Sequence, residues 1–423
     1  MSGPTAAQLR RLTTEYDLLE VRRGGDYFVL GDAATLARLR AEGLRVSVER
    51  TLPALGRTIT SPSAASSRSA TSDGAAAVAA YQTFNGGYHT VAAHQQHLAD
   101  VAAQYPQLAT VVDYGDSWLR TRGRGGNDLL ALCVTRKVAG DCALTPTAPK
   151  PRSVVYAAIH ARELATAEIA WNWIDHLVTS YGSDAAVTAL LDSTEVWVIP
   201  VANPDGRQIV EGGGNRPYSQ RKNANDSRGS CRTPPTTTSQ YGVDLNRNAT
   251  WQWGGVGSSS TACNLTYRGT AASSEPETTA QQTLFNSLFA DRRGPARSDA
   301  APADTTGTFM SYHSYAGLIL YPWGDVAADA PNGAKLKALA DRMAVHNGYT
   351  TGQGGEVLYA TTGTTDDDLY GRLGVASFTT ELGAEGTSCD GFMPPYSCVA
   401  SRFWPQERKA LMTLAQAAAG PYR

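Results

Sequence analysis

His160 and Glu163 have the residue types and the spacing that can hold a metal ion. They stand three residues apart, directly after the apolar run 153–159, which predicts a buried strand, and at the start of a helical pattern. At such a turn an imidazole and a carboxylate can face one point, and both are suitable zinc ligands. His313 also stands at the end of a predicted strand, 308–313. Two histidines and one glutamate leave a fourth position for water, as in a catalytic site, and predict one Zn²⁺ per chain.

A second pair of histidines offers a competing site. His94 and His97 also stand three residues apart, on a predicted helix, but no third ligand is evident near them in the sequence. We therefore interpret both as solvated helix positions.

The elements that must position these residues alternate along the chain. Strand patterns at 195–201 and 375–382 are interspersed with helical patterns at 333–346 and 405–419. This alternation predicts an α/β sheet covered by helices on both faces. Ligands of such folds bind beyond the C-terminal ends of the strands, which is where His160 stands.

The first part of the chain has a different composition. We expect a small α+β unit over residues 1–57, a linker over 58–80 and the main domain over 81–423. The linker is almost entirely Ser, Ala, Thr and Gly, which predicts flexibility and exposure to proteases. A folded unit before such a linker suggests a pro-region, and an accessory domain on a tether is the alternative. The elements expected in this unit are strands at 16–21, 27–30 and 44–48 and a helix at 35–41.

Charge and cysteines bear on partners and compartment. The net charge of −2 shows no bias toward nucleic acid or an anionic membrane, and no apolar stretch is long enough to span a bilayer. Six cysteines fall in neighbouring pairs, which predict disulfides and an oxidising compartment. The polar start of the chain shows no leader, so we expect a secreted protein whose leader has been removed. The expected pairs are Cys133–Cys142, Cys231–Cys263 and Cys389–Cys398.

The segment Ala157–Glu163 resembles the zinc motif of the funnelin metallocarboxypeptidases, the family of the pancreatic carboxypeptidases A and B. Further motifs of that family follow in the same order, so the resemblance covers roughly residues 81 to 419. With its linker and small N-terminal unit, the chain looks most similar to the secreted bacterial and actinobacterial branch. The further motifs are Asn203–Pro204–Asp205–Gly206, Gln220–Arg221–Lys222–Asn223, Gly242–Val243–Asp244–Leu245–Asn246–Arg247–Asn248, Tyr267–Arg268–Gly269, Ser274–Glu275–Pro276–Glu277, His313–Ser314–Tyr315, Tyr359 and Phe378–Thr379–Thr380–Glu381–Leu382.

The resemblance implies a mixed, mostly parallel, eight-stranded sheet flanked by helices and an active site for peptide hydrolysis. Glu381 would be the general base, because a carboxylate beside an activated water can move its proton. Arg221 would stabilise the charge that develops on the scissile carbonyl. Arg247, assisted by Asn246, would receive the free C-terminal carboxylate, because a guanidinium pairs with a carboxylate through two hydrogen bonds.

The remaining roles follow from the same resemblance. Tyr359 would close over the substrate, and Tyr315 would also contact it. Arg162 would provide an outer site for a carboxylate, and Asp244 would orient the imidazole of His160. The resemblance further implies a cis peptide bond between Ser314 and Tyr315.

Asp366 carries the prediction of specificity. The spacing from Tyr359 to Glu381 equals that of the pancreatic enzymes, and this register puts Asp366 at the base of the side-chain pocket. A carboxylate in a nearly closed pocket needs a partner, so we predict a preference for C-terminal Lys or Arg. Apolar C-termini could also be accepted, and Asp366 could instead face solvent or pair with Arg372. The chain departs from the family pattern at Asp368, where Trp is common, and at Thr364, where Gly is frequent.

Other functions compete with this hypothesis. A zinc amidase of the same fold acting on cell-wall peptides, and a non-catalytic carboxypeptidase-like binding module, are the main alternatives. A serine hydrolase is disfavoured because there is no GxSxG motif. We expect the partners to be peptide or protein C-termini and an activating protease at the linker, with no nucleic acid or membrane, and we expect a secreted monomeric zymogen.

Overall fold

The computed structural model describes residues 3–51, 81–384 and 386–423. The predicted linker at 58–80 and the last predicted residues of the N-terminal unit lie outside these ranges. None of the helices in the described part combines the length and the apolar character that a bilayer crossing requires.

A twisted eight-stranded sheet forms the centre of the main domain, as the family resemblance implied. Its strand order is β11-β10-β12-β9-β7-β8-β6-β5. The pairs among β12, β9, β7 and β8 are parallel, and so is β10 with β11, whereas β10–β12, β6–β8 and β5–β6 are antiparallel. The strands are β5 (Ala109–Asp116), β6 (Asp128–Val134), β7 (Arg152–Ala157), β8 (Glu195–Ile199), β9 (Thr308–Ser314), β10 (Leu318–Tyr321), β11 (Thr350–Gln353) and β12 (Ala376–Leu382). A separate small hairpin consists of β3 (Thr83–Phe84) and β4 (Tyr88–His89).

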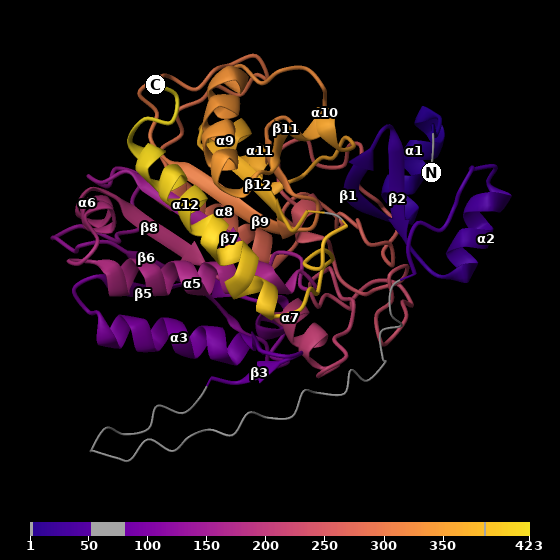
Figure 1. The fold of residues 1–423 in the computed structure, drawn as a ribbon, viewed down its shortest axis with the longest axis horizontal. Coiled ribbons are helices and arrows are strands. Elements are labelled where there is room, and N and C mark those ends of the chain that lie inside the picture. Colours follow the sequence, from indigo (N-terminus) through magenta and orange to yellow (C-terminus); the bar gives the residue numbers. More distant parts are fainter. Residues whose placement is uncertain (1–2, 52–80, 385) are drawn as a thin grey trace.

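Helices cover both faces of the sheet, and Figure 1 shows α3, α5 and α12 stacked on one of them. That face also packs against α6 and α9, while α8 and α11 cover the other face. The helices are α3 (Val91–Gln104), α4 (Trp118–Thr121), α5 (Leu164–Ser180), α6 (Ala185–Ser193), α7 (Pro204–Glu211), α8 (Pro276–Leu288), α9 (Gly333–Asn347), α10 (Gly354–Val357), α11 (Thr365–Leu373) and α12 (Trp404–Gln416).

Strand β7 shows why the sheet is covered on both sides. All six of its residues are buried, and they alternate between the two cores. Val155 and Ala157 pack with α5 and α12, whereas Val154 and Tyr156 pack with α8. A strand with two apolar faces can only be central in a sheet, which explains its continuous apolar run.

The N-terminal unit, residues 3–51, packs beside the end of the sheet (Figure 1). It consists of α1 (Ala6–Glu15), β1 (Asp17–Arg23), β2 (Asp26–Leu30) and α2 (Ala33–Ala41), with β1 and β2 antiparallel. Helix α1 was not predicted, although Thr5 and Gln8 form a capping box at its start. The predicted strand at 44–48 is wrong. Leu44 is buried, Val46 is partly buried and Val48 is exposed, and among the described residues no strand pairs with this segment.

The structure contains disulfides between the three expected pairs of cysteines, Cys133–Cys142, Cys231–Cys263 and Cys389–Cys398. The peptide bond between Ser314 and Tyr315 is cis.

Candidate active site

His160, Glu163 and His313 meet at the C-terminal edge of the sheet. Strand β7 ends at Ala157, and the chain turns through Ala158, whose φ is +53°, before His160. His313 belongs to the neighbouring strand β9, where Tyr312 is the register partner of Ala157. Parallel strands that end at one edge thus bring residues 153 positions apart together.

The three side chains can hold a metal ion. The Nδ1 atoms of His160 and His313 lie 3.0 Å apart, and the Glu163 carboxylate oxygens lie 2.8 Å and 3.3 Å from these two nitrogens. All three residues are buried, and their ligand atoms lie within 4.8 Å of one another. Two imidazole nitrogens that face each other beside a carboxylate suit a shared cation, and the donor set matches zinc.

We call His160, Glu163 and His313 the metal group. Asp244 links this group to Arg221. Its Oδ1 lies 3.2 Å from Nε2 of His160, and its Oδ2 accepts a hydrogen bond of 3.1 Å from Nε of Arg221. A donor at Nε2 leaves Nδ1 as the acceptor that a metal needs. Burial acts to raise the pKa of Asp244, but Arg221 and then His160 outweigh it and hold the pKa well below its usual 3.8. The carboxylate therefore stays ionised between its two partners.

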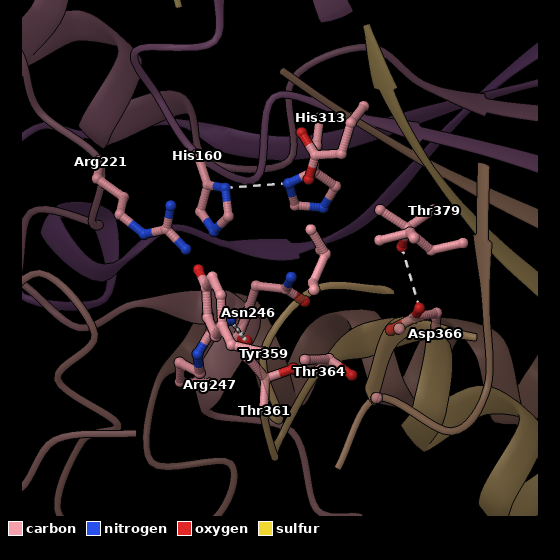
Figure 2. Close-up of a pocket in the computed structure, with 15 residues that line it drawn as sticks. His160, Arg221, Asn246, Arg247, His313, Tyr359, Thr361, Thr364, Asp366 and Thr379 are labelled. Atoms are coloured by element: carbon pink, nitrogen blue, oxygen red, sulfur yellow. Dashed lines mark hydrogen bonds between the residues drawn. The ribbon is translucent and has the colours of Figure 1, made fainter. Parts of the chain in front are cut away.

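One pocket is lined by His160, His313, Arg221 and the predicted base Glu381, together with the other predicted groups Asn246, Arg247, Tyr359 and Asp366 (Figure 2). Glu381 belongs to β12, and its register partner on β9 is His313. The predicted general base and a predicted metal ligand therefore lie on neighbouring strands at the same level of the sheet.

The segment with Asn246 and Arg247 forms a short 3-10 turn, Leu245–Arg247, that Asp244 caps. Arg247 donates from Nε to the carbonyl of Gly257 at 2.9 Å and from Nη1 to the carbonyl of Asn246 at 2.7 Å. These backbone acceptors fix the plane of the guanidinium at the wall of the pocket.

Asp366 lies at the other end of the pocket, on the first turn of α11 (Figure 2). Its Oδ2 accepts a hydrogen bond of 3.1 Å from Oγ1 of Thr379. The next two acids point elsewhere: Asp367 accepts from the backbone N–H of Gly324, and Asp368 pairs with Arg372 at 2.8 Å. Arg372 is therefore the partner of Asp368 in this structure. Burial, and then Asp366, raises the pKa of Asp367 well above its usual 3.8.

Residues 94–407 match the family described as zinc carboxypeptidases. The chain belongs to the zinc carboxypeptidase family. Carboxypeptidase A2 of Mus musculus is 30% identical over 318 residues, which cover 73% of this chain and 65% of that protein. A metallocarboxypeptidase A-like protein of Trichophyton verrucosum is 29% identical over 326 residues, or 74% of this chain and 67% of the relative. The aligned part thus spans about two thirds of the length of these zinc carboxypeptidases.

Solved structures resemble the chain in fold. Bovine thrombin-activatable fibrinolysis inhibitor, in complex with tick carboxypeptidase inhibitor, has a TM-score of 0.59 and 25% identity over 78% of this chain and 96% of that chain. A crystal structure of thrombin-activatable fibrinolysis inhibitor matches 98% of both chains with a TM-score of 0.67 and 22% identity, so the likeness in fold includes the N-terminal unit. The relatives named here are animal and fungal, and the expected bacterial branch of the family is not confirmed.

Three predicted substrate residues of this zinc carboxypeptidase contact the N-terminal unit. Both terminal nitrogens of the Arg162 guanidinium donate to the Asp17 carboxylate, at 2.7 Å and 2.8 Å. The Tyr359 hydroxyl donates to the carbonyl of Leu18 at 3.4 Å. Tyr315 packs in an apolar cluster with Leu19 and other side chains of β1 and β2. Arg162 and Tyr315 therefore face β1 rather than the pocket wall.

The interpretation of His94 and His97 as solvated is wrong. Both are buried, with 2% and 4% exposure, because α3 turns this side toward Trp171 on α5. We call His89, His94, His97, Glu168 and Trp171 the Trp171 group. In the described part of the chain, these residues do not meet the geometry of a metal site, whereas His160, Glu163 and His313 do.

Several pocket residues were not predicted. Thr379 stands two positions before Glu381 on β12, so the two side chains share one face of the strand, and this spacing could have identified it. Leu320, Gly324, Gly354 and the residues 358 and 361 come from segments that converge only in the fold. Asp17 likewise carries no signal that would connect it with Arg162.

Proposed function

We propose that the protein is a secreted zinc carboxypeptidase that removes single residues from the C-termini of peptides, prefers Lys or Arg, and is made as a zymogen. The observation that carries this proposal is the shared pocket. Two of the predicted metal ligands, the predicted carboxylate base, the Arg247 guanidinium and the Asp366 carboxylate line one cavity.

The residues of this chain divide the chemistry between them. Zinc, when bound by His160, Glu163 and His313, would polarise the scissile carbonyl and lower the pKa of a nearby water. Glu381 accepts the proton of the attacking water and passes it to the leaving amine. Arg221, held by Asp244, donates to the carbonyl oxygen as negative charge develops there.

Recognition of the end of the chain falls to Arg247. Its guanidinium is held by two backbone carbonyls, so little conformational entropy remains to be lost when a carboxylate binds. Asn246 stands beside it, and Tyr359 covers the same pocket. An endopeptidase has no use for such a receptor, which favours an exopeptidase.

The preference for Lys or Arg rests on Asp366. Hydrolysis of benzoyl-Gly-Arg and benzoyl-Gly-Leu, with and without a chelator, tests both the zinc chemistry and the preference. In Asp366→Ile we expect the Arg/Leu ratio of kcat/KM to fall by roughly 100-fold, because an uncompensated charge on the substrate would then be buried. An unchanged ratio would show that Asp366 does not read the side chain, and activity that survives complete metal removal would refute the zinc assignment.

The N-terminal unit supports the zymogen proposal. Asp17 neutralises Arg162, and Leu18 engages Tyr359, so adjacent residues of β1 occupy two groups proposed to bind substrate. We expect the full chain to be inactive until it is cut in the predicted linker at 58–80, and Asp17→Ala to raise activity before cutting. Equal activity of the intact and cut chains would show that the unit is an accessory domain.

The alternatives receive less support. A binding module would not need the base and the ligands together, and this pocket keeps Glu381 beside the metal group. The preferred substrate distinguishes a cell-wall amidase from a carboxypeptidase. Faster cleavage of a murein peptide than of benzoyl-Gly-Arg would favour the amidase. The three disulfides favour export. We also propose that the protein is a monomer.

A further inference from the structure

Trp251 lies behind the pocket, where the segment that carries Arg247, helix α11 and the loop with Trp323 meet. It follows Arg247 by four residues, stacks on Trp323 and covers Gly371 of α11. Neither its sequence position nor the family resemblance assigned it a role. It does not line the pocket itself, so any effect on substrate must pass through its neighbours.

The backbone of Trp251 ties the carboxylate receptor to the start of α11. Its N–H donates to Oδ1 of Asp368 at 2.9 Å, and its carbonyl accepts from the N–H of Gly363 at 3.2 Å. On the receptor side, Oδ1 of Asn246 accepts from the N–H of Thr365 at 2.9 Å. The receptor and the helix that carries the pocket acid are thus joined at several points.

The indole of Trp251 connects these two parts to the loop that carries Trp323. It lies parallel to the indole of Trp323, with ring centroids 5.1 Å apart and planes at 7°. The guanidinium of Arg293 lies 5.4 Å and 5.1 Å from these two rings. Trp323 precedes Gly324, a residue of the pocket wall, and a Cβ at Gly371 would overlap the Trp251 ring. Helix α11 therefore approaches this indole as closely as a glycine permits.

Asp368, the departure from the family pattern, completes the arrangement. Its side chain is 2% exposed, and its carboxylate accepts from the Trp251 N–H, from Nε2 of Gln282 at 3.1 Å and from Nε of Arg372 at 2.9 Å. At the position where the family resemblance led us to expect Trp, this chain has a buried carboxylate, and Trp251 supplies the indole that contacts Gly371 of α11.

We propose that Trp251 is a positioning residue that couples recognition of the substrate's C-terminal carboxylate to recognition of its C-terminal side chain. The inference rests on the proposed function, in which Arg247 takes the carboxylate and Asp366 the side chain. Both contacts require a fixed distance between the receptor and α11, and Trp251 sets that distance through Asp368 and Gly371. His160 and Glu163 follow the end of β7, His313 lies on β9 and Glu381 lies on β12, so their placement does not depend on Trp251.

The test compares Trp251→Ala and Trp251→Phe in the proteolytically activated enzyme with benzoyl-Gly-Arg and benzoyl-Gly-Leu. In Trp251→Ala we expect KM for benzoyl-Gly-Arg to rise about tenfold while kcat stays within about threefold, because misplacement of α11 weakens binding more than chemistry. The Arg/Leu ratio of kcat/KM should fall at least about threefold, and Trp251→Phe should restore it to within about twofold. In the Asp366→Ile background, Trp251→Ala should no longer change the ratio.

Trp253→Ala is the matched control, because Trp253 contacts Arg268 and does not touch α11 in the contacts described. A ratio that Trp251→Ala leaves unchanged, or that Trp253→Ala changes equally, overturns the coupling. If Trp251→Ala does not fold, Asp368→Asn decides: we expect the Arg/Leu ratio of kcat/KM to shift in the same direction, and an unchanged ratio in Asp368→Asn overturns the coupling. A wild-type enzyme that hydrolyses neither substrate overturns the proposed function and the coupling with it.

Discussion

Two groups of buried histidines in this molecule differ in how their rings meet. In the metal group, His160 and His313 come from strand ends and turn their Nδ1 atoms toward each other at 3.0 Å. In the Trp171 group, His89 and His97 stack on the indole of Trp171, with ring centroids 3.8 Å and 3.6 Å from it. Converging nitrogens can share a cation, whereas stacked faces leave the nitrogens pointing outward.

The acids follow the same division. Glu163 lies within 3.3 Å of both imidazoles of the metal group. Around Trp171 each stacked ring has its own acid, Glu168 for His89 at 2.8 Å and Asp175 for His97 at 2.7 Å. Spacing of three residues between potential ligands is common to both groups, so the direction of the ring nitrogens separates a metal site from a packed core.

Loss of a metal ligand should give the largest difference between the metal group and the Trp171 group. We expect His313→Ala to lose zinc and about 10³-fold or more in kcat/KM, since a metal supplies several kcal/mol of transition-state stabilisation. His97→Ala, the matched control, should keep full metal content and activity. Metal analysis of the purified variants checks both, and zinc that stays bound in His313→Ala would contradict the assignment of the ligands.

Replacing the acids separates chemistry from packing. Glu381→Gln should keep its metal and fold but lose about 10²–10⁴-fold in kcat, because an amide cannot accept the proton of water. Glu168→Gln should leave kcat unchanged and lower Tm by a few degrees, because His89 loses a buried charged acceptor. Steady-state kinetics and thermal unfolding of the two variants give the contrast, and near-normal turnover in Glu381→Gln would require a different base.

Acid should affect the Trp171 group through His94. Burial, and then Arg207, lowers the pKa of His94 well below its ordinary 6.5, and neither ring nitrogen has a hydrogen-bond partner in the described part of the chain. His89 and His97 also face this ring. A depressed pKa of a base gives stability that is present above pH 6.5 and lost as the pH falls.

The variant His94→Leu tests this titration. The loss of unfolding free energy between pH 6.5 and 5 should be smaller than in the wild type, by up to about 1.4 kcal/mol per pH unit for one proton. Urea unfolding at several pH values measures it. Parallel pH profiles of the wild type and the variant would mean that His94 does not govern acid stability.

The smallest expected effect concerns the stacking itself. A double-mutant cycle with His89→Ala and Trp171→Leu should give a coupling of about 1 kcal/mol, the range for an aromatic pair beyond its buried area. The same cycle with His346→Ala in place of His89→Ala should give a coupling near zero, because His346 contacts Thr413 on α12 instead. A zero value in the first cycle would show that the two rings contribute only through burial.

The sequence predicted the sheet and the metal group because both leave local marks. Apolar runs that are followed by His160 and His313 place potential ligands at one edge of a parallel sheet, regardless of the conformation of the connecting loops. The burial of His94 and His97 could also have been predicted, since with Leu98 and Val101 they form one stripe of α3 at helical spacing. The missing third ligand argued against a metal site but carried no information about exposure, so it did not justify the interpretation of these histidines as solvated.

Other features leave no local mark. The pair Asp17–Arg162 joins residues 145 positions apart, and the contact between Trp251 and Trp323 depends on two loops that meet only after the sheet has formed. The segment at 44–48 shows the converse case: a local strand pattern is present, but no strand in the described ranges pairs with it.

The parallel register between β9 and β12 has a consequence for divergence. Because Glu381 and His313 are register partners, backbone hydrogen bonds rather than side-chain packing determine the separation of the predicted base from the predicted metal ligand. Most core residues around them can then be exchanged without moving either group. An insertion of one residue within either strand, by contrast, would turn one of the two to the opposite face. The sequence around Glu381 and His313 can therefore diverge widely without separating the two side chains, provided that both strands keep their length.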